Sequence, residues 1–165
     1  MYAAGMARPT ATPEFGMQLD AQLCFDLYAA SRAVTSAYRP LLGDLGLTYP
    51  QYLVMLVLWE RERCTVRELG DVLQLDSGTL SPLLKRLTAA GLVRRERGTD
   101  DERTVEATLT AEGRELEMKA QSIPSAIGAA MGLAPAEFAA LKQTLRRLVT
   151  NVSTSTPASR SQLPG

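Results

Sequence analysis

The amino-acid sequence predicts a mainly α-helical protein with one small β-hairpin, arranged in the order of a winged helix-turn-helix fold. Three observations lead to this prediction. Apolar residues recur at helical spacing near both ends of the chain, a short and a longer helix flank a tight turn in its middle, and two strand-like runs follow the longer helix. A chain of 165 residues is long enough to bury the core of one such domain.

The first predicted helix occupies most of residues 18–42. One of its faces is apolar because apolar residues recur at spacings of three and four, at Leu19, Leu23, Leu27, Ala30 and Val34. Gly43 and Gly46 end the helix. The preceding residues 1–16 combine Ala, Pro and Thr without an apolar run, so we expect a disordered tail there and not a signal peptide.

Capping patterns predict the next two helices. A Thr followed three residues later by Gln or Glu is typical of a helix N-terminus, and this pattern occurs at Thr48 with Gln51 and at Thr65 with Glu68. The first pair predicts a helix over residues 49–61, which is apolar on nearly every side and is therefore expected to be buried. The second pair predicts a short helix over residues 66–73.

A longer helix follows a break at residues 75–78 and runs to Ala90, where Gly91 is placed to cap its C-terminus. Pro82 has no N–H to donate to the carbonyl four residues before it. The helix therefore either begins near residues 79–81 or has an irregular first turn, and the sequence leaves both alternatives open.

After Gly91 the helical periodicity gives way to two short runs with strand character. These runs cover residues 92–97 and 103–109, and the polar residues 98–101 between them predict a turn. The three segments together predict the β-hairpin.

Two helical stretches are predicted in the C-terminal part. One follows Thr110 and ends near Gln121, and Pro124 with the Gly-containing stretch to Gly132 interrupts it or separates it from a last helix. Apolar residues of the last helix fall on one stripe, at Phe138, Leu141, Leu145, Leu148 and Val149. We expect residues 153–165 to form a second disordered tail.

Charge is balanced over the whole chain but concentrated locally. Eighteen basic and eighteen acidic residues give a formal net charge of zero, whereas residues 77–97 hold five basic residues and one acid. Such a basic cluster neutralises DNA phosphates, and small hydroxyl side chains at a helix N-terminus can reach phosphates or base edges. The predicted DNA-binding residues are Ser77, Thr79, Ser81, Lys85, Arg86, Arg94, Arg95 and Arg97. The alternative is an amphipathic helix beside an ordinary solvated hairpin.

The composition excludes several kinds of chemistry. The absence of histidine excludes Ser-His-Asp and Cys-His catalysis and any zinc site with histidine ligands. Cys24 and Cys64 are too few for a cysteine-only metal cage in one chain, so we expect neither a metal nor a cofactor. Two cysteines also favour a reducing cytoplasm over secretion. The longest apolar run, residues 52–59, is too short to cross a bilayer, so we expect no membrane partner.

The stretch LDSGTLSPLLKRLTAAGLVRRERGTDDERTVEATLTAEG, residues 75–113, resembles the DNA-binding core of the MarR family of bacterial regulators. Within it, DERTV is similar to the family's wing signature, whose Asp–Arg pair shapes the hairpin. The resemblance assigns this role to Asp101 and Arg103. It also implies a homodimer whose first and last helices interlock between subunits and which binds a pseudo-palindromic operator in double-stranded DNA.

The resemblance divides the chain into three functional segments between the two tails. Residues 17–47 are expected to form the N-terminal dimerisation and sensor helix. The winged helix-turn-helix region is expected to cover residues 48–110. Residues 111–152 are expected to form the C-terminal dimerisation helices.

Cys24 is a candidate reactive thiol on the first predicted helix. Only the thiolate is nucleophilic, and an unperturbed thiol is about 3% ionised at pH 7. Four of the five tyrosines follow Cys24 within 28 residues, and hydroxyl groups of this kind can stabilise a thiolate where histidine and lysine are absent. The alternative is that Cys24 is only a small apolar residue of the helix stripe.

The stretch LCFDLYAASRAVTSAYRPLLGDLGLTYPQYLVMLVLWE, residues 23–60, is similar to the organic hydroperoxide resistance regulators, the OhrR branch of the MarR family. The resemblance implies that Cys24 is the peroxide sensor. It also implies that Tyr38 and Tyr49 are contributed from the partner subunit to hydrogen-bond the thiolate, and that Tyr28 is a third tyrosine of the sensor pocket.

The same resemblance implies a redox-sensing repressor that binds DNA when reduced and is released when an organic hydroperoxide oxidises Cys24 to a sulfenic acid. One branch of the family carries a resolving cysteine in the stretch that corresponds to residues 125–131, and this chain has none there. Cys64 lies elsewhere and is expected to be structural or incidental, with a resolving role as the alternative. The sulfenic acid is therefore expected to form a mixed disulfide with a low-molecular-weight thiol or to be overoxidised.

Two other functions remain compatible with the sequence. A MarR-type repressor could be released by a small phenolic ligand, with Cys24 inert. A thiol peroxidase is the alternative from another class, but peroxidases usually need an arginine beside the thiolate, and Arg32 lies eight residues from Cys24. We therefore expect that the protein is not an enzyme.

Overall fold

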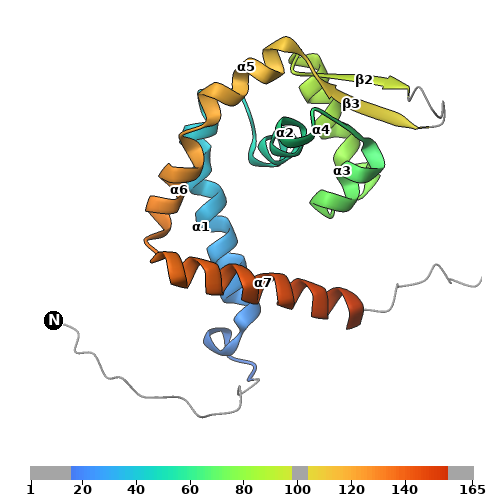
Figure 1. Cartoon of the computed structure of the whole chain (residues 1–165). Helices are drawn as coiled ribbons and strands as arrows, with labels where there is room; N and C mark the ends of the chain where they lie inside the picture. Colours follow the sequence, from blue (N-terminus) through green and yellow to red (C-terminus); the bar gives the residue numbers. More distant parts are fainter. Residues whose placement is uncertain (1–15, 98–103, 156–165) are drawn as a thin grey trace, which may run out of the picture. The chain divides into compact units, whose positions relative to one another are not determined.

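The computed structural model describes residues 16–97 and 104–155 (Figure 1). Its internal contacts divide the chain into two compact units, one that ends at Gln121 and one that begins at Ser122. The first unit contains a 3-10 turn η1 (Leu19–Ala21), α1 (Leu23–Gly43), α2 (Tyr49–Arg61), β1 (Arg63–Thr65), α3 (Val66–Leu73), α4 (Ser77–Ala89), β2 (Val93–Arg97), β3 (Val105–Leu109) and α5 (Ala111–Ala120). The second contains α6 (Ile123–Met131) and α7 (Pro135–Ser155).

Helices α2, α3 and α4 pack together and the hairpin β2–β3 projects beside them (Figure 1). A short helix, a tight turn, a longer helix and an antiparallel hairpin follow one another along the chain. The predicted fold class, mainly helical with a winged helix-turn-helix, is therefore confirmed.

Both predicted capping boxes are present. The side-chain oxygen of Gln51 accepts hydrogen bonds from the backbone N–H and the hydroxyl of Thr48, at 2.8 and 2.9 Å. Glu68 accepts from the backbone N–H and hydroxyl of Thr65, whose hydroxyl oxygen accepts in turn from the backbone N–H of Glu68. These bonds satisfy backbone donors that a helix N-terminus otherwise leaves unpaired, and α2 and α3 begin where the sequence predicts.

The structure decides between the two alternatives for Pro82. Helix α4 begins at Ser77, where Asp76 is the N-cap and its carboxylate accepts from the backbone N–H of Thr79 at 2.9 Å. Pro82 therefore lies inside the helix, which forgoes one backbone hydrogen bond there. At the other end Gly91 has a φ of 74°, and its N–H and that of Leu92 close the helix as a Schellman motif.

The hairpin belongs to a three-stranded antiparallel sheet in the order β1-β3-β2. Cys64 of β1 and Arg95 of β2 both pair with Ala107 of the central strand β3. The sequence does not predict β1, because three residues between two helices carry no alternation of apolar and polar side chains. Pairing with β3 creates the strand, so only the tertiary structure reveals it.

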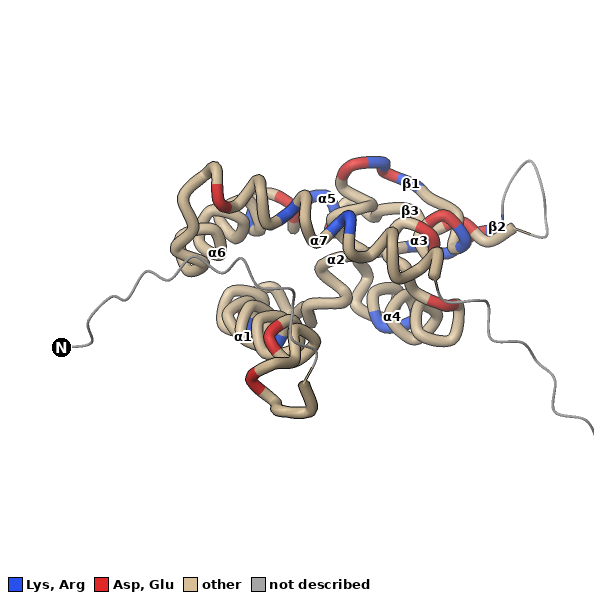
Figure 2. The backbone as a smooth tube through the Cα atoms, turned by 90° about the horizontal axis from the view of Figure 1, so that it is seen from below, with Lys and Arg blue, Asp and Glu red and all other residues tan. Residues whose placement is uncertain are grey.

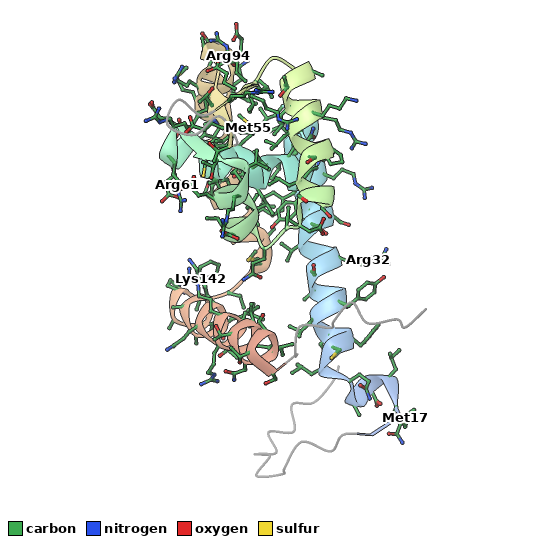
Figure 3. The ribbon with its side chains drawn as sticks, turned by 90° about the vertical axis from the view of Figure 1, so that its right-hand side faces the viewer. Met17, Arg32, Met55, Arg61, Arg94 and Lys142 are labelled. Carbon is green, nitrogen blue, oxygen red and sulfur yellow. The ribbon has the colours of Figure 1, made fainter. Side chains whose placement is uncertain are left out.

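The core of the first unit lies between α2, the two helices of the helix-turn-helix and the sheet. Leu58, Leu69 and Leu84 are fully buried, as is Met55, which Figure 3 labels among the packed helices. The indole N–H of Trp59 donates to the backbone carbonyl of Gly113 at 2.8 Å and so links α2 to α5. Helix α5 belongs to the first unit, and its expected role in dimerisation stays a prediction.

The second unit differs from the sequence prediction in two places. Residues 123–131 form the separate helix α6, because Pro124 lies in its first turn, where no backbone N–H is needed, and Gly132 ends it with a φ of 63°. Helix α7 extends to Ser155, so residues 153–155 are helical and not part of a tail. The rest of the two predicted tails, residues 1–15 and 156–165, lies outside the described residues.

No single helix of the described ranges is both long and apolar enough to span a membrane. One bent pair of segments, Ala111–Met131 with Pro135–Ser155, reaches that length and composition only when its members are counted together.

Candidate nucleic-acid interface and thiol site

A groove of about 640 Å³ lies between the long helix of the helix-turn-helix and the hairpin. Helix α4 packs against strand β2. This contact brings a lysine of the helix and an arginine of the strand to the same groove. The residues that line it are Ser77, Gly78, Ser81, Pro82, Lys85 and Arg95. Four predicted DNA-binding residues, Ser77, Ser81, Lys85 and Arg95, are thus brought together.

The other predicted DNA-binding residues are exposed but do not line this groove. Arg86 lies on α4 and Arg94 and Arg97 on β2, and all three side chains are exposed. Figure 2 shows basic positions on α4, and Figure 3 labels Arg94 on the hairpin. Exposed basic residues are therefore present on α4 and β2 beyond those that line the groove.

Thr79 has a structural task that the sequence did not assign to it. Its backbone N–H and its hydroxyl both donate to the carboxylate of Asp76, at 2.9 and 3.0 Å. These bonds lower the pKa of Asp76, and the bond from the backbone N–H of Thr79 has the larger effect. Asp76 is therefore ionised at neutral pH, where it caps the positive end of the α4 dipole.

The predicted wing pair, Asp101 and Arg103, lies outside the described residues. Its proposed role in shaping the hairpin stays a prediction.

Cys24 is the second residue of α1, and its side chain is exposed. Apolar neighbours on the same helix, Leu23 and Phe25, are exposed as well. The alternative that Cys24 is a small buried residue therefore does not hold within a single chain. The thiol is open to a reagent in solution.

A cluster of aromatic side chains lies at the other end of α1. The ring of Tyr38 lies 4.7 Å from that of Tyr49 and 5.7 Å from that of Tyr52, measured between centroids, and Tyr52 contacts Trp59 edge-on at 6.0 Å. Partial burial, reinforced by its two tyrosine neighbours, raises the pKa of Tyr38. Burial and the neighbouring Tyr49 raise the pKa of Tyr52. These two phenols keep their protons, and hence their capacity to donate, at neutral pH.

The aromatic cluster and Cys24 are far apart within one chain. Fourteen residues of continuous helix separate Cys24 from Tyr38, which corresponds to about 21 Å along the helix axis. A hydroxyl of Tyr38 or Tyr49 therefore cannot reach the Cys24 sulfur of its own chain. The structure brings together two of the predicted sensor tyrosines, and their predicted contact with the thiol, which lies between subunits, stays a prediction.

Tyr28, the third predicted sensor tyrosine, lies one helical turn after Cys24. The Nη1 atom of Arg32 donates to the hydroxyl oxygen of Tyr28 at 2.9 Å, and the guanidinium carbon lies 5.5 Å from the ring centroid. Sequence reasoning considered Arg32 only as a neighbour of Cys24 and missed this pair. The spacing of four residues between Tyr28 and Arg32 is the signal that could have revealed it.

Cys64 has the opposite surroundings to Cys24. It is buried in the sheet, where its thiol donates to the Glu68 carboxylate at 3.6 Å. Burial, followed by the negative charge of Glu68, raises the pKa of the Cys64 thiol. A buried thiol with a raised pKa is a poor nucleophile, which agrees with the expected structural role.

Among the described residues no group of three or more cysteine and carboxylate side chains could hold a metal ion.

Comparison with known proteins identifies the family. The model of the transcriptional regulators SarA and Rot matches residues 36–119. The organic hydroperoxide resistance transcriptional regulator of Bacillus subtilis is 49% identical over 138 residues, which are 84% of this chain and 92% of that protein. The regulator TtmR of Methylorubrum extorquens is 49% identical over 147 residues, which are 87% of this chain and 75% of that protein.

Solved structures of AbfR from Staphylococcus epidermidis have the same fold. The overoxidised form bound to DNA matches with a TM-score of 0.68 at 37% identity and covers 82% of this chain and 96% of that chain. A disulfide-bonded form matches with a TM-score of 0.55 at 41% identity and covers 81% of this chain and 93% of that chain. The chain therefore belongs to the MarR and SarA family of winged helix-turn-helix proteins and is a DNA-binding transcriptional regulator, not an enzyme.

Proposed function

We propose that this regulator is a redox-sensing repressor, which binds operator DNA as a homodimer when reduced and is released when an organic hydroperoxide oxidises Cys24. One observation carries the proposal: the exposed thiol of Cys24 and the tyrosine cluster lie at opposite ends of α1, at positions that two antiparallel copies of the helix would bring together. A relative that is 49% identical is an organic hydroperoxide resistance regulator.

The groove between α4 and β2 supports the DNA-binding half of the proposal. Lys85 and Arg95 offer positive charge to phosphates, and Ser77 and Ser81 offer hydroxyls from the first turns of α4. We assign DNA contacts to these four residues, and to Thr79, Arg86, Arg94 and Arg97 around them. A two-fold dimer would read a pseudo-palindromic operator with half-sites about one helical turn apart.

The distance within α1 supports the homodimer. Because Tyr38 and Tyr49 cannot reach Cys24 of their own chain, these phenols stabilise its thiolate only if a second chain contributes them. The apolar side chains exposed beside Cys24 on α1 offer a surface for that second chain. They also favour apolar alkyl hydroperoxides over hydrogen peroxide as the oxidant.

The chemistry of release starts at the Cys24 sulfur. Its thiolate attacks the terminal oxygen of the hydroperoxide, so that an S–O bond forms, the O–O bond breaks, the sulfur is oxidised to a sulfenic acid and the peroxide is reduced to an alcohol. The negative charge that the tyrosines stabilised is then lost, which shifts the dimer interface and the two α4 helices that it positions.

The fate of the sulfenic acid follows from the second cysteine. Cys64 is buried with a raised pKa, so it does not compete for the sulfenic acid of Cys24. A low-molecular-weight thiol from the cytoplasm, where we place the protein, therefore forms a mixed disulfide with Cys24, or further peroxide overoxidises it.

Fluorescence anisotropy of the protein on a palindromic operator tests the proposal. Reduced protein should bind, one equivalent of an organic hydroperoxide should release it, and a thiol reductant should restore binding. Cys24→Ser should bind DNA as the unaltered chain does and ignore peroxide, with Cys64→Ser as the matched control that still responds. Release of the Cys24→Ser variant by peroxide contradicts the assignment, and tight binding of the unaltered protein that ignores peroxide would favour release by a small phenolic ligand instead.

A further inference from the structure

Arg32 and Tyr28 form a coupled pair on the exposed side of α1. A guanidinium N–H donates to the Tyr28 hydroxyl at 2.9 Å, and the guanidinium carbon lies 5.5 Å from the centre of the ring. Figure 3 labels Arg32 on this helix. The side chain of Tyr28 is 56% exposed, and these two contacts fix the position of its phenol ring.

The direction of this hydrogen bond leaves the proton of Tyr28 free for another acceptor. Arginine has only donors, so it occupies a lone pair of the phenol oxygen and not the hydroxyl proton. The guanidinium of Arg32 approaches Tyr28 from the turn after it, and Cys24 lies on the turn before it. The three residues follow one another at spacings of four along one row of the helix surface.

We propose that Arg32 is a positioning residue for the oxidation of Cys24, which holds Tyr28 so that its hydroxyl donates to the oxygen atom that leaves the peroxide. This inference rests on the proposed function. It adds a role for the same chain's Tyr28 and Arg32, beside the tyrosines that a second chain would contribute.

The step balances without a further reagent. When the thiolate sulfur bonds to the terminal peroxide oxygen, the O–O bond breaks and its electron pair remains on the alkoxide. The alkoxide takes the hydroxyl proton of Tyr28 and becomes the alcohol. The positive guanidinium of Arg32 stabilises the resulting phenolate, which regains its proton from water.

Stopped-flow measurement of Cys24 oxidation by tert-butyl hydroperoxide tests this inference, with Cys64→Ser as the background so that only one thiol reacts. We expect Arg32→Gln and Tyr28→Phe each to slow the second-order rate constant by roughly tenfold, a modest share of the effect of a general acid. Because Arg32 acts through Tyr28, the double variant should be no slower than Tyr28→Phe alone. Arg32→Lys, which keeps the charge, should recover part of the rate.

Arg39→Gln, on the same helix but outside the row, is the matched control and should oxidise at the unaltered rate. Operator affinity of the reduced variants should stay unchanged, because neither side chain is part of the DNA-binding groove. An Arg32→Gln rate equal to that of the unaltered chain, or additive effects in the double variant, would overturn the role of Arg32 and leave the sensor intact. A chain whose Cys24 ignores the peroxide overturns both proposals at once.

Discussion

Helices α4 and α1 both carry an apolar stripe at helical spacing, yet the folded chain treats them differently. Leu80, Leu84 and Leu87 of α4 are at most 1% exposed, because α2, α3 and the sheet cover them. On α1, Leu23 is 62% exposed and Phe25 40%. The helix-turn-helix region therefore buries its apolar stripe within the first unit, whereas α1 leaves apolar side chains exposed.

The same contrast applies to the helix termini and to the second unit. Helices α3 and α4 are capped by the side chains of Thr65 and Asp76, whereas Gln22 at the start of α1 makes no capping bond. On α7, Phe138, Leu141, Leu145 and Val149 remain exposed. We therefore expect local stability to be concentrated in the winged helix-turn-helix region, and the helices that we propose to dimerise to depend on association.

The largest expected effect is a difference in stability between variants in the core around α4 and variants in the exposed stripe of α7. Leu84→Ala should lower the free energy of unfolding by about 2–5 kcal/mol, because it leaves a cavity in the closed core. Leu145→Ala should change the melting temperature by an amount that depends on protein concentration, since its stripe is covered only in the proposed dimer. Calorimetry of both variants over a range of concentrations measures this difference. A concentration-independent effect of Leu145→Ala would contradict the proposed role of α7.

The two thiols sharpen the comparison further. An aromatic disulfide reagent should label Cys24 at once and Cys64 on the order of a hundredfold more slowly, because the sheet must open locally before the reagent reaches Cys64. The raised pKa of Cys64 acts in the same direction, since it reduces the thiolate fraction at a given pH. Single variants Cys24→Ser and Cys64→Ser assign the two phases. Equal labelling rates in the native state would mean that the sheet does not protect Cys64.

A charge in the groove between α4 and β2 should affect DNA affinity without affecting stability. Lys85→Ala should weaken operator binding roughly tenfold and reduce the slope of log affinity against log salt by about one, as expected for the loss of a phosphate contact. Lys142→Ala on α7 is the matched control. Anisotropy titrations at several salt concentrations provide both quantities, and an unchanged slope for Lys85→Ala would exclude a phosphate contact by this side chain.

The smallest expected effect concerns the cap of α3. Thr65→Ala should cost about 1 kcal/mol of stability, because the backbone N–H of Glu68 loses its partner. Hydrogen bonds from Thr65 lower the pKa of Glu68, so the stabilisation by this carboxylate is present above the ordinary carboxyl pKa and is lost as pH falls through the lowered value. Urea unfolding of the unaltered protein and of Thr65→Ala at several pH values should show that the difference between their free energies of unfolding decreases in acid. A difference that does not depend on pH would contradict this linkage.

Local chemistry predicted most of the helices with their boundaries. Thr48 with Gln51 and Thr65 with Glu68 act through bonds within four residues, so their helices begin where the sequence places them. The family resemblance was also predictable, because it rests on contiguous stretches of residues. The sequence left the first residue of α4 undecided, because Pro82 disfavours a helix that continues through it. In the structure the helix begins at Ser77, where the side chain of Asp76 caps it, and it includes Pro82.

The remaining features depend on residues that are distant in sequence. Strand β1 exists because β3 pairs with it, and the groove at α4 exists because β2 brings Arg95 beside Lys85. Residue types and spacing determine which helices form and which groups could react. The separation of Cys24 from Tyr38 follows already from the predicted helix, because a continuous helix keeps its two ends apart. Which groups of different elements lie within reach of one another, as Tyr38 of α1 and Tyr49 of α2 do, follows only from the packing of the chain.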